Sequence, residues 1–143
     1  MLRGRFGSTS HAPYIEGHIV FPRLNIRGNV SFMVDTGADN GVIMPADARR
    51  FGLDYSKLRN PRKCIGLNGL SRTFGEGALL TFADSRKTYT YNVKVDFIPP
   101  NPDLEKTPSL LGRDILERWR MIYDPSRKTL SFKVISADLT KSI

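Results

Sequence analysis

The stretch Phe32-Met33-Val34-Asp35-Thr36-Gly37-Ala38-Asp39 holds the most informative pattern in the sequence. Its apolar residues predict a strand that leads directly into the carboxylate of Asp35. Gly37 permits a tight turn that a side chain would obstruct, and the hydroxyl of Thr36 can hydrogen-bond within that turn. The pattern predicts a carboxylate in a fixed orientation, as general acid or base catalysis requires. The alternative interpretation of Asp35 is an aspartate that only stabilises a turn.

A second stretch, Ser109-Leu110-Leu111-Gly112-Arg113-Asp114-Ile115-Leu116, lies nearer the C-terminus. Two apolar residues, a glycine and the start of a helix predicted over 113–120 indicate a strand that passes close to another backbone. A glycine-rich stretch at 65–77 lies between the two segments. Each segment alone is only moderately specific, but the two together, in this order and with the glycines between them, form a strong signal.

The rest of the pattern is mostly strand. The clearest alternation runs over 89–97, with Tyr, Val and Phe residues on one face and polar residues on the other. Further strands are expected over 14–21, 24–26, 30–34, 79–82, 121–123 and 130–134, with a turn at 28–29 and a short helix over 45–51. We therefore expect one all-β domain over 14–135, a flexible N-terminal tail over 1–13 and a C-terminal tail over 136–143.

The composition excludes several classes of protein. The chain has 143 residues, of which 40% are hydrophobic and 25% charged, so extensive disorder, collagen and coiled coil are not expected. One cysteine and two histidines leave no internal disulfide and no Cys-rich zinc site, and we expect neither a metal nor a cofactor. No apolar run approaches the length of a membrane span and no secretory segment is present, so a cytoplasmic location and no membrane partner are expected.

The charge balance is basic. Lys and Arg number 22 against 14 Asp and Glu, which gives a formal net charge of +8. The basic residues are spread along the chain, and no basic motif interleaved with aromatic residues occurs. We interpret them as solvated surface charge, so we do not expect nucleic acid as a partner. A nucleic-acid-associated protein remains a third hypothesis, and it predicts binding that weakens steeply with salt.

With these segments in view, the chain resembles the retropepsin-like aspartic proteases, the family of retroviral proteases and their bacterial and cellular relatives. The segment 35–39 matches the catalytic motif of that family, 110–114 resembles its second signature, and 65–70 resembles its flap. The resemblance covers 14–134. It implies an all-β, closed, partly barrel-like protomer with a short C-terminal helix and a flap hairpin, acting as a homodimer without a cofactor.

A single catalytic motif has a consequence for assembly. Aspartic proteases use two carboxylates that share one proton, yet the chain contains only one Asp-Thr/Ser-Gly sequence, since Asp84-Ser85 is followed by Arg86. The second carboxylate must then come from a second copy. Mechanism and count predict a two-fold homodimer with one Asp35 from each protomer at the axis.

The resemblance also implies a role for each site residue. Asp35 is the catalytic residue, Thr36 and Gly37 support its loop, and Asp39 pairs with Arg113. The expected substrate contacts are Ala38, Asp39, Gly66, Leu67, Asn68, Gly69 and Leu70, and the expected structural residues are Gly112, Arg113 and Asp114. The expected function is an aspartic endopeptidase acting on an extended polypeptide. The alternative is a non-catalytic, dimeric peptide-binding or protein-binding module on the same fold.

Overall fold

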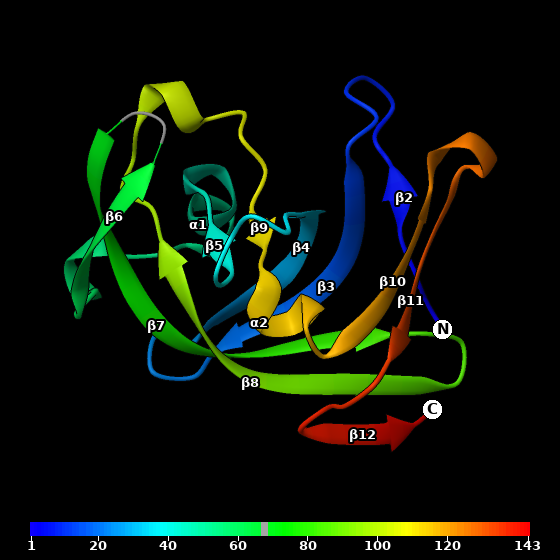
Figure 1. Cartoon of the computed structure of the whole chain (residues 1–143). Coiled ribbons are helices and arrows are strands. Elements are labelled where there is room, and N and C mark those ends of the chain that lie inside the picture. Colours follow the sequence, from blue (N-terminus) through cyan, green and yellow to red (C-terminus); the bar gives the residue numbers. More distant parts are fainter. Residues whose placement is uncertain (67–68) are drawn as a thin grey trace.

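The computed structural model describes residues 1–66 and 69–143, and most of the chain is β-strand (Figure 1). The N-terminal part contains β1 (Leu2–Arg3), β2 (Arg5–Phe6), β3 (Pro13–Phe21), β4 (Ile26–Val34) and β5 (Val42–Ile43). The middle contains α1 (Pro45–Phe51), the 3-10 turn η1 (Tyr55–Lys57), β6 (Pro61–Gly66), β7 (Gly69–Ala83) and β8 (Lys87–Phe97). The C-terminal part contains η2 (Pro102–Leu104), β9 (Leu110–Leu111), α2 (Arg113–Leu116), β10 (Trp119–Asp124), η3 (Pro125–Arg127), β11 (Thr129–Val134) and β12 (Leu139–Ser142).

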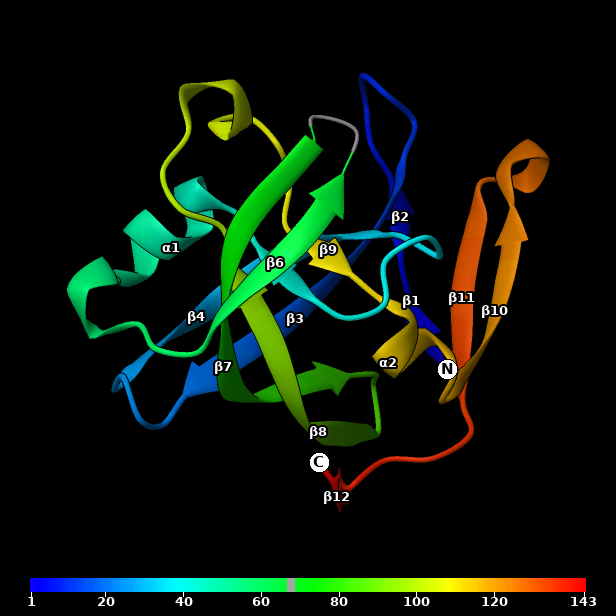
Figure 2. The same ribbon diagram turned by 60° about the vertical axis from the view of Figure 1, so that its left-hand side comes forward.

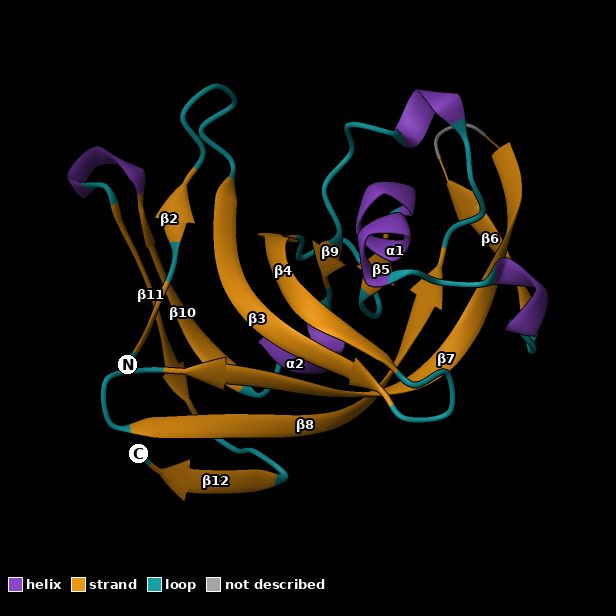
Figure 3. Ribbon diagram, turned by 180° about the vertical axis from the view of Figure 1, so that it is seen from behind, coloured by secondary structure: helices purple, strands orange, loops and turns teal. Residues whose placement is uncertain are grey.

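Six of the described strands close into a barrel. They are hydrogen-bonded in the order β8-β5-β9-β4-β3-β7, and β7 pairs again with β8. Strands β6, β12 and β2 extend this sheet by pairing with β7, β8 and β3. Figure 3 shows how strongly β3, β4 and β7 curve around the interior. The expected all-β, partly barrel-like fold with a short helix near its C-terminal end is confirmed, and the β6–β7 hairpin lies where the flap is expected.

A second, smaller sheet with the order β1-β11-β10 packs beside the barrel. Aromatic side chains join the two sheets. The ring of Trp119 on β10 lies 4.8 Å from that of Phe82 in the barrel and 5.0 Å from that of Phe132 on β11, measured between centroids. The indole Nε1 of Trp119 donates a hydrogen bond of 2.7 Å to the hydroxyl of Tyr91. Burial of these rings, with their polar atoms paired, fixes the small sheet against the barrel.

Helix α1 begins and ends where its sequence predicts. Pro45 occupies the first turn, where its missing N–H costs no hydrogen bond. Gly52 ends the helix in the left-handed conformation with φ of 78°, and its N–H donates to the carbonyl of Arg49 at 3.0 Å. The helix over 45–51 is therefore confirmed. In the part of the chain that is described, no helix combines the length and the hydropathy that a membrane span requires.

The predicted turn at Gly28-Asn29 is wrong. The chain turns at 22–25 instead, where Asn25 adopts φ of 53° and donates its N–H to the carbonyl of Pro22 at 3.3 Å. Gly28 lies inside β4, where it pairs with Ile19 of β3. A Cβ atom there would come within 2.3 Å of the ring of Phe51, so this close contact favours glycine. This glycine is a site of close packing between α1 and the sheet, a reason that a local pattern does not reveal.

The predicted helix over 113–120 is shorter in the structure. It ends at Leu116, and β10 begins at Trp119, which pairs with Val134 of β11. Ile115 is buried, as expected for the inner face of a helix, and so is Trp119. The four-residue spacing of Ile115 and Trp119 fits a helix, so the spacing does not reveal where the helix ends. The strand begins at Trp119 because that residue pairs with β11.

Both predicted tails contain paired strands. At the N-terminus, Leu2 and Arg3 pair with β11, and Leu2 is only 1% exposed. At the C-terminus, β12 pairs with the edge of β8. Strands of two to four residues are too short to show an alternating pattern, so pairing of this kind leaves little trace in the sequence.

Candidate active site

Asp35 lies at the end of β4, where the two informative segments of the sequence meet. Strand β4 runs parallel to β9, with Val34 opposite Leu111. The N–H of Asp35 then continues the ladder by donating to the carbonyl of Leu111 at 3.0 Å. Asp35 is half-buried. Its backbone is therefore anchored in the barrel while its carboxylate remains accessible.

The turn after Asp35 fixes its carboxylate. The N–H of Gly37 donates to Oδ1 of Asp35 at 2.9 Å, and the N–H of Ala38 donates to the Asp35 carbonyl at 3.2 Å. A Cβ atom at Gly37 would lie 3.2 Å from that same Oδ1, which is tighter than ordinary contact. Glycine at this position leaves room for the carboxylate to receive the amide. The predicted preorganisation of Asp35 is thus visible in its hydrogen bonds.

Arg113 links helix α2 to the turn. Its Nη1 donates to the carbonyl of Thr36 at 2.7 Å, and its Nη2 contacts the carboxylate of Asp39. The expected contact between Asp39 and Arg113 is therefore confirmed. The side chain of Asp39 is 87% exposed, so solvent screens this ion pair. The bond to Thr36 uses the main-chain carbonyl, whereas the sequence drew attention to the hydroxyl.

The start of α2 packs directly against the loop 35–41. The N–H groups of Arg113 and Asp114 donate to the carbonyls of Ala38 and Asp39, at 2.8 and 3.2 Å. A Cβ atom at Gly112 would come within 2.6 Å of the backbone carbon and oxygen of Asn40. This close approach explains why glycine precedes the helix, as the second segment predicts.

Asp114 supports the loop from its buried side. Burial raises the pKa of its carboxyl, and hydrogen bonds from the backbone amides of Ile115 and Gly41 oppose that shift. The hydrogen bond from the N–H of Ile115 to Oδ1 of Asp114 measures 2.9 Å. Among residues 1–66 and 69–143, no group of three or more His, Cys, Asp and Glu side chains is arranged to hold a metal ion.

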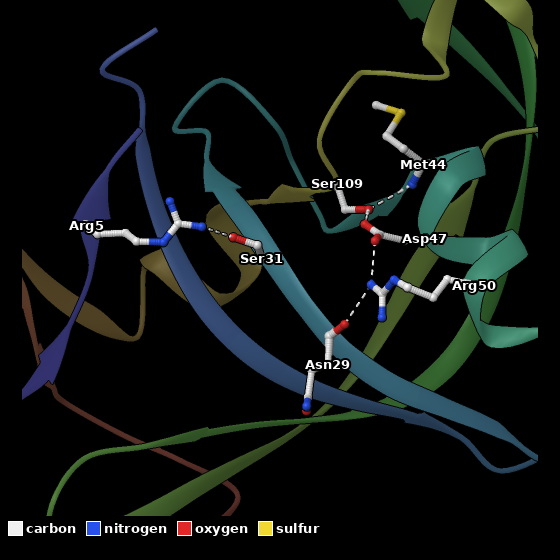
Figure 4. Close-up of polar contacts among 7 residues, drawn as sticks. All are labelled: Arg5, Asn29, Ser31, Met44, Asp47, Arg50 and Ser109. Carbon is white, nitrogen blue, oxygen red and sulfur yellow. Dashed lines mark hydrogen bonds and ion pairs between the residues drawn. The ribbon is translucent and has the colours of Figure 1, made fainter. Parts of the chain in front are cut away.

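A polar network that sequence reasoning missed is centred on Ser109, the residue before β9 (Figure 4). The hydroxyl of Ser109, which is fully buried, donates to Oδ2 of Asp47 at 2.6 Å and accepts the N–H of Met44 at 3.0 Å. Arg50 bridges Asp47 and the carbonyl of Asn29. The network fastens α1 to the residue that precedes β9. A serine before an apolar pair gives no sign in the sequence of such burial.

Asp96 is a second residue near the site that the sequence did not single out. It is 8% exposed, and its Oδ2 accepts a hydrogen bond of 2.7 Å from Nδ2 of Asn40, at the end of the loop. Asp96 falls on the polar face of the alternating strand 89–97. The alternating pattern therefore predicts that Asp96 faces solvent. It is buried because the neighbouring loop covers this end of the strand.

The structure describes only part of the expected flap. Strands β6 and β7 form an antiparallel hairpin in which Gly66 pairs with Gly69 and Ile65 with Leu70. Leu67 and Asn68 lie outside the described residues. The expected substrate contacts of this hairpin stay predictions.

Comparison with known proteins identifies a matching family and similar solved structures. The family described as gag-polyprotein putative aspartyl protease matches residues 23–118. A crystal structure of a retropepsin-like aspartic protease from Rickettsia conorii is similar with a TM-score of 0.62 and 25% identity, over 89% of this chain and 94% of that one. EIAV protease in complex with the inhibitor HBY-793 shares the fold, with a TM-score of 0.53 and 18% identity over 78% of this chain and 90% of that one.

A curated relative, "Uncharacterized protein RP867" of Rickettsia prowazekii (strain Madrid E), is 29% identical over 105 residues. The match covers 73% of this chain and 42% of the relative, so the chain spans less than half of that protein's length.

Proposed function

Because the chain belongs to the retropepsin-like family of aspartic proteases, we propose that it is an endopeptidase that uses two Asp35 carboxylates, one from each of two copies. The observation that carries this proposal is the preorganised carboxylate of Asp35. It stands at the end of a barrel strand, half-buried, with one oxygen bound to the amide of Gly37. A carboxylate that is both oriented and accessible is what general acid or base catalysis requires.

The chemistry would follow from the sharing of one proton. Two carboxylates that lie close together cannot both ionise, so one stays protonated. The ionised carboxylate takes a proton from water, and the water oxygen attacks the scissile carbonyl carbon. The protonated carboxylate gives its proton to the carbonyl oxygen. Collapse of the tetrahedral intermediate then breaks the C–N bond as the leaving nitrogen is protonated.

Two carboxylates that lie close to the Asp35 loop are engaged with other groups. Asp39 is engaged with Arg113 at the solvent-facing side of the loop. Asp114 lies on the buried side and accepts the Ile115 amide. Neither faces Asp35 as a free partner, which supports a site completed by a second copy.

An exposed apolar edge supports association with a second copy. Met121, Ile122 and Tyr123 are 38%, 40% and 51% exposed and follow one another on β10, an edge strand of the small sheet. Strand β10 starts three residues after α2 ends, and α2 begins against the loop of Asp35. Figure 2 shows β10 and β11 on the side of the molecule opposite α1. An edge with three consecutive apolar residues is suited to pairing with another chain.

The substrate we propose is an extended polypeptide. The loop residues Ala38 and Asp39 and the β6–β7 hairpin, from Gly66 to Leu70, would contact its backbone in the manner of an added strand. Cleavage then needs no cofactor, since the two carboxylates supply both the base and the acid.

The proposal is tested by exposing an unbiased peptide library to the wild type and to Asp35→Asn from acid to neutral pH at high protein concentration. The variant should lose activity by roughly 10³-fold or more, and a pepstatin-like statine should inhibit the wild type. Asp103→Asn, an exposed aspartate in η2, is the matched control and should cleave like the wild type. Cleavage by Asp35→Asn at the wild-type rate would overturn the proposal. A dimeric wild type that binds but never cleaves would establish a peptide-binding module instead.

A further inference from the structure

The carboxylate of Asp96 lies between the β6–β7 hairpin and the loop that carries Asp35. On β8, Asp96 is opposite Gly75 of β7 on one side and Val42 of β5 on the other. Its N–H donates to the carbonyl of Gly41, the last residue of the loop, at 3.0 Å. Asp96 therefore contacts the base of the β6–β7 hairpin and the end of the loop, and the proposed function assigns the tip of that hairpin and the start of that loop to the active site.

The two oxygens of this carboxylate face different partners. Oδ2 accepts the amide of Asn40 at 2.7 Å. Oδ1 is buried and has no hydrogen-bond partner among the described residues, while Nε of Arg62 on β6 lies 3.6 Å from it. A buried carboxylate is costly unless a cation or hydrogen bonds offset its charge. On its Oδ1 side, the described cation in ion-pair range is the Arg62 guanidinium.

The absence of a side chain at Gly75 leaves the space that the Arg62 guanidinium occupies. A Cβ atom at Gly75 would lie 2.7 Å from Nη2 and 2.8 Å from Nε of Arg62. The guanidinium thus lies against bare backbone, and even a methyl group would displace it. Because its target is the end of a flexible side chain, such a methyl group would move Arg62 at little cost to the fold.

We propose that Arg62, Asp96 and Asn40 form a tether through which the base of the β6–β7 hairpin positions the loop 35–41. If Arg62 moves away, the charge at Oδ1 is no longer offset. The carboxylate then gains by turning toward water, which breaks its bond to Asn40. The coupling is reciprocal, so release of Asn40 also loosens Arg62. Asp96 acts in this account as a positioning residue.

A second ion pair with a buried carboxylate lacks this link between two segments. Both oxygens of Glu76 are bound by the Nε of Arg23 at 3.1 Å, and Arg23 Nη2 donates to one of them at 2.6 Å. That guanidinium also donates to the carbonyl of Lys57, at 2.8 Å. Glu76 is thus satisfied by its own partner, whereas the two oxygens of Asp96 connect two different segments.

The test compares Gly75→Ala with Gly77→Ala by hydrogen–deuterium exchange of the whole protein without substrate. Both glycines lie on β7, but a Cβ atom at Gly77 meets nothing within 4 Å. Gly75→Ala should accelerate exchange at least threefold both at the amides of 62–64 and at those of 37–41. Gly77→Ala should leave the loop amides unchanged. Arg62→Met removes the charge directly and should act like Gly75→Ala.

A third variant separates the two halves of the tether. Asp96→Asn keeps an oxygen for Asn40 but removes the charge, so it should accelerate exchange in the hairpin and not in the loop. Faster exchange confined to the hairpin in Gly75→Ala and Arg62→Met would overturn the tether. The consequence for catalysis rests on the proposed function. For a cleaved peptide, Gly75→Ala and Arg62→Met should each raise KM several-fold, whereas Gly77→Ala should not. Absence of cleavage in the wild type would refute the proposed function and leave the exchange result to decide the tether.

Discussion

Asp35 combines an anchored backbone with an oriented, accessible carboxylate. Its backbone is bound into the barrel through the carbonyl of Leu111, and its carboxylate is accessible yet oriented by the amide of Gly37. The orientation is present without substrate, so the proposed reaction would need no reorganisation of this carboxylate. At the scale of single residues, this is the feature on which the proposed chemistry depends.

Arg113 should matter more to stability through Thr36 than through Asp39. Arg113→Met loses a charged donor from the Thr36 carbonyl and should lower the free energy of unfolding by about 1–2 kcal/mol. Asp39→Asn loses only an ion pair whose acid is mostly in solvent, and should cost less than about 1 kcal/mol. Urea unfolding of both variants, at low and high salt, measures the difference. An equal or larger loss in Asp39→Asn would contradict this assignment.

Much of the candidate site could be predicted from its residues, because the information is local. The two short segments that contain Asp35, Gly37 and Gly112 indicate the roles of these residues without the rest of the chain. Asp96 and Ser109 could not be predicted, since each becomes buried only when a distant segment folds over it. The same limit applies to Gly28, whose role is set by the ring of Phe51 from α1.

At the scale of elements, the carboxylate of Asp84 helps to close the hairpin β7–β8, beside a backbone bond from the Asp84 N–H to the Lys87 carbonyl. Oδ1 of Asp84 accepts the N–H groups of Arg86 and Lys87, each at 2.8 Å. These amides are the main cause that lowers the pKa of Asp84 to about 2, from a usual value of 3.8. The hairpin also supplies two strands of the barrel, so its turn contributes to the frame that holds the site.

Asp84 should therefore make stability depend on acid pH. A lowered pKa in the folded state means that the ionised carboxylate stabilises the fold above about pH 4, and that this contribution disappears as pH falls toward about 2. Asp84→Asn should be less stable than the wild type at neutral pH, and the difference should shrink through that window. Thermal unfolding at several pH values measures it, with Asp103→Asn as the control. A difference that stays constant with pH would contradict this role.

At this scale, the alternating pattern predicts most strands, but it does not predict where strands and helices end. The helix over 45–51 has both a proline and a glycine to mark its bounds. The helix that starts at Arg113 has no such stop, so its four residues were extended to eight in the prediction. The short strands at both ends of the chain depend on partners supplied by β8 and β11.

At the scale of the whole molecule, one chain holds half of the proposed active site. In the proposed dimer, the exposed apolar residues of β10 would favour association, while the formal charge of +8 per chain would oppose it at low salt. The balance of the two would make assembly depend on ionic strength. Added salt should favour the dimer.

A charge on β10 should weaken this association without unfolding the chain. Ile122→Lys places like charges on the edge strand of both copies and should raise the dissociation constant of the dimer at least tenfold, or about 1.4 kcal/mol. Leu79→Lys is the matched control, because Leu79 on β7 is also 40% exposed. Sedimentation equilibrium measures both variants. Dimers of equal strength in Ile122→Lys and the wild type would place the interface elsewhere.

The most direct test of the central claim is to mix wild-type protein with Asp35→Asn at a constant total concentration and to follow peptide cleavage. If each active site needs Asp35 from two copies, activity falls with the square of the wild-type fraction, to about a quarter in an equal mixture. If each chain acts alone, activity falls in proportion, to about half. A quadratic fall is the predicted result, and a linear one would contradict the shared site.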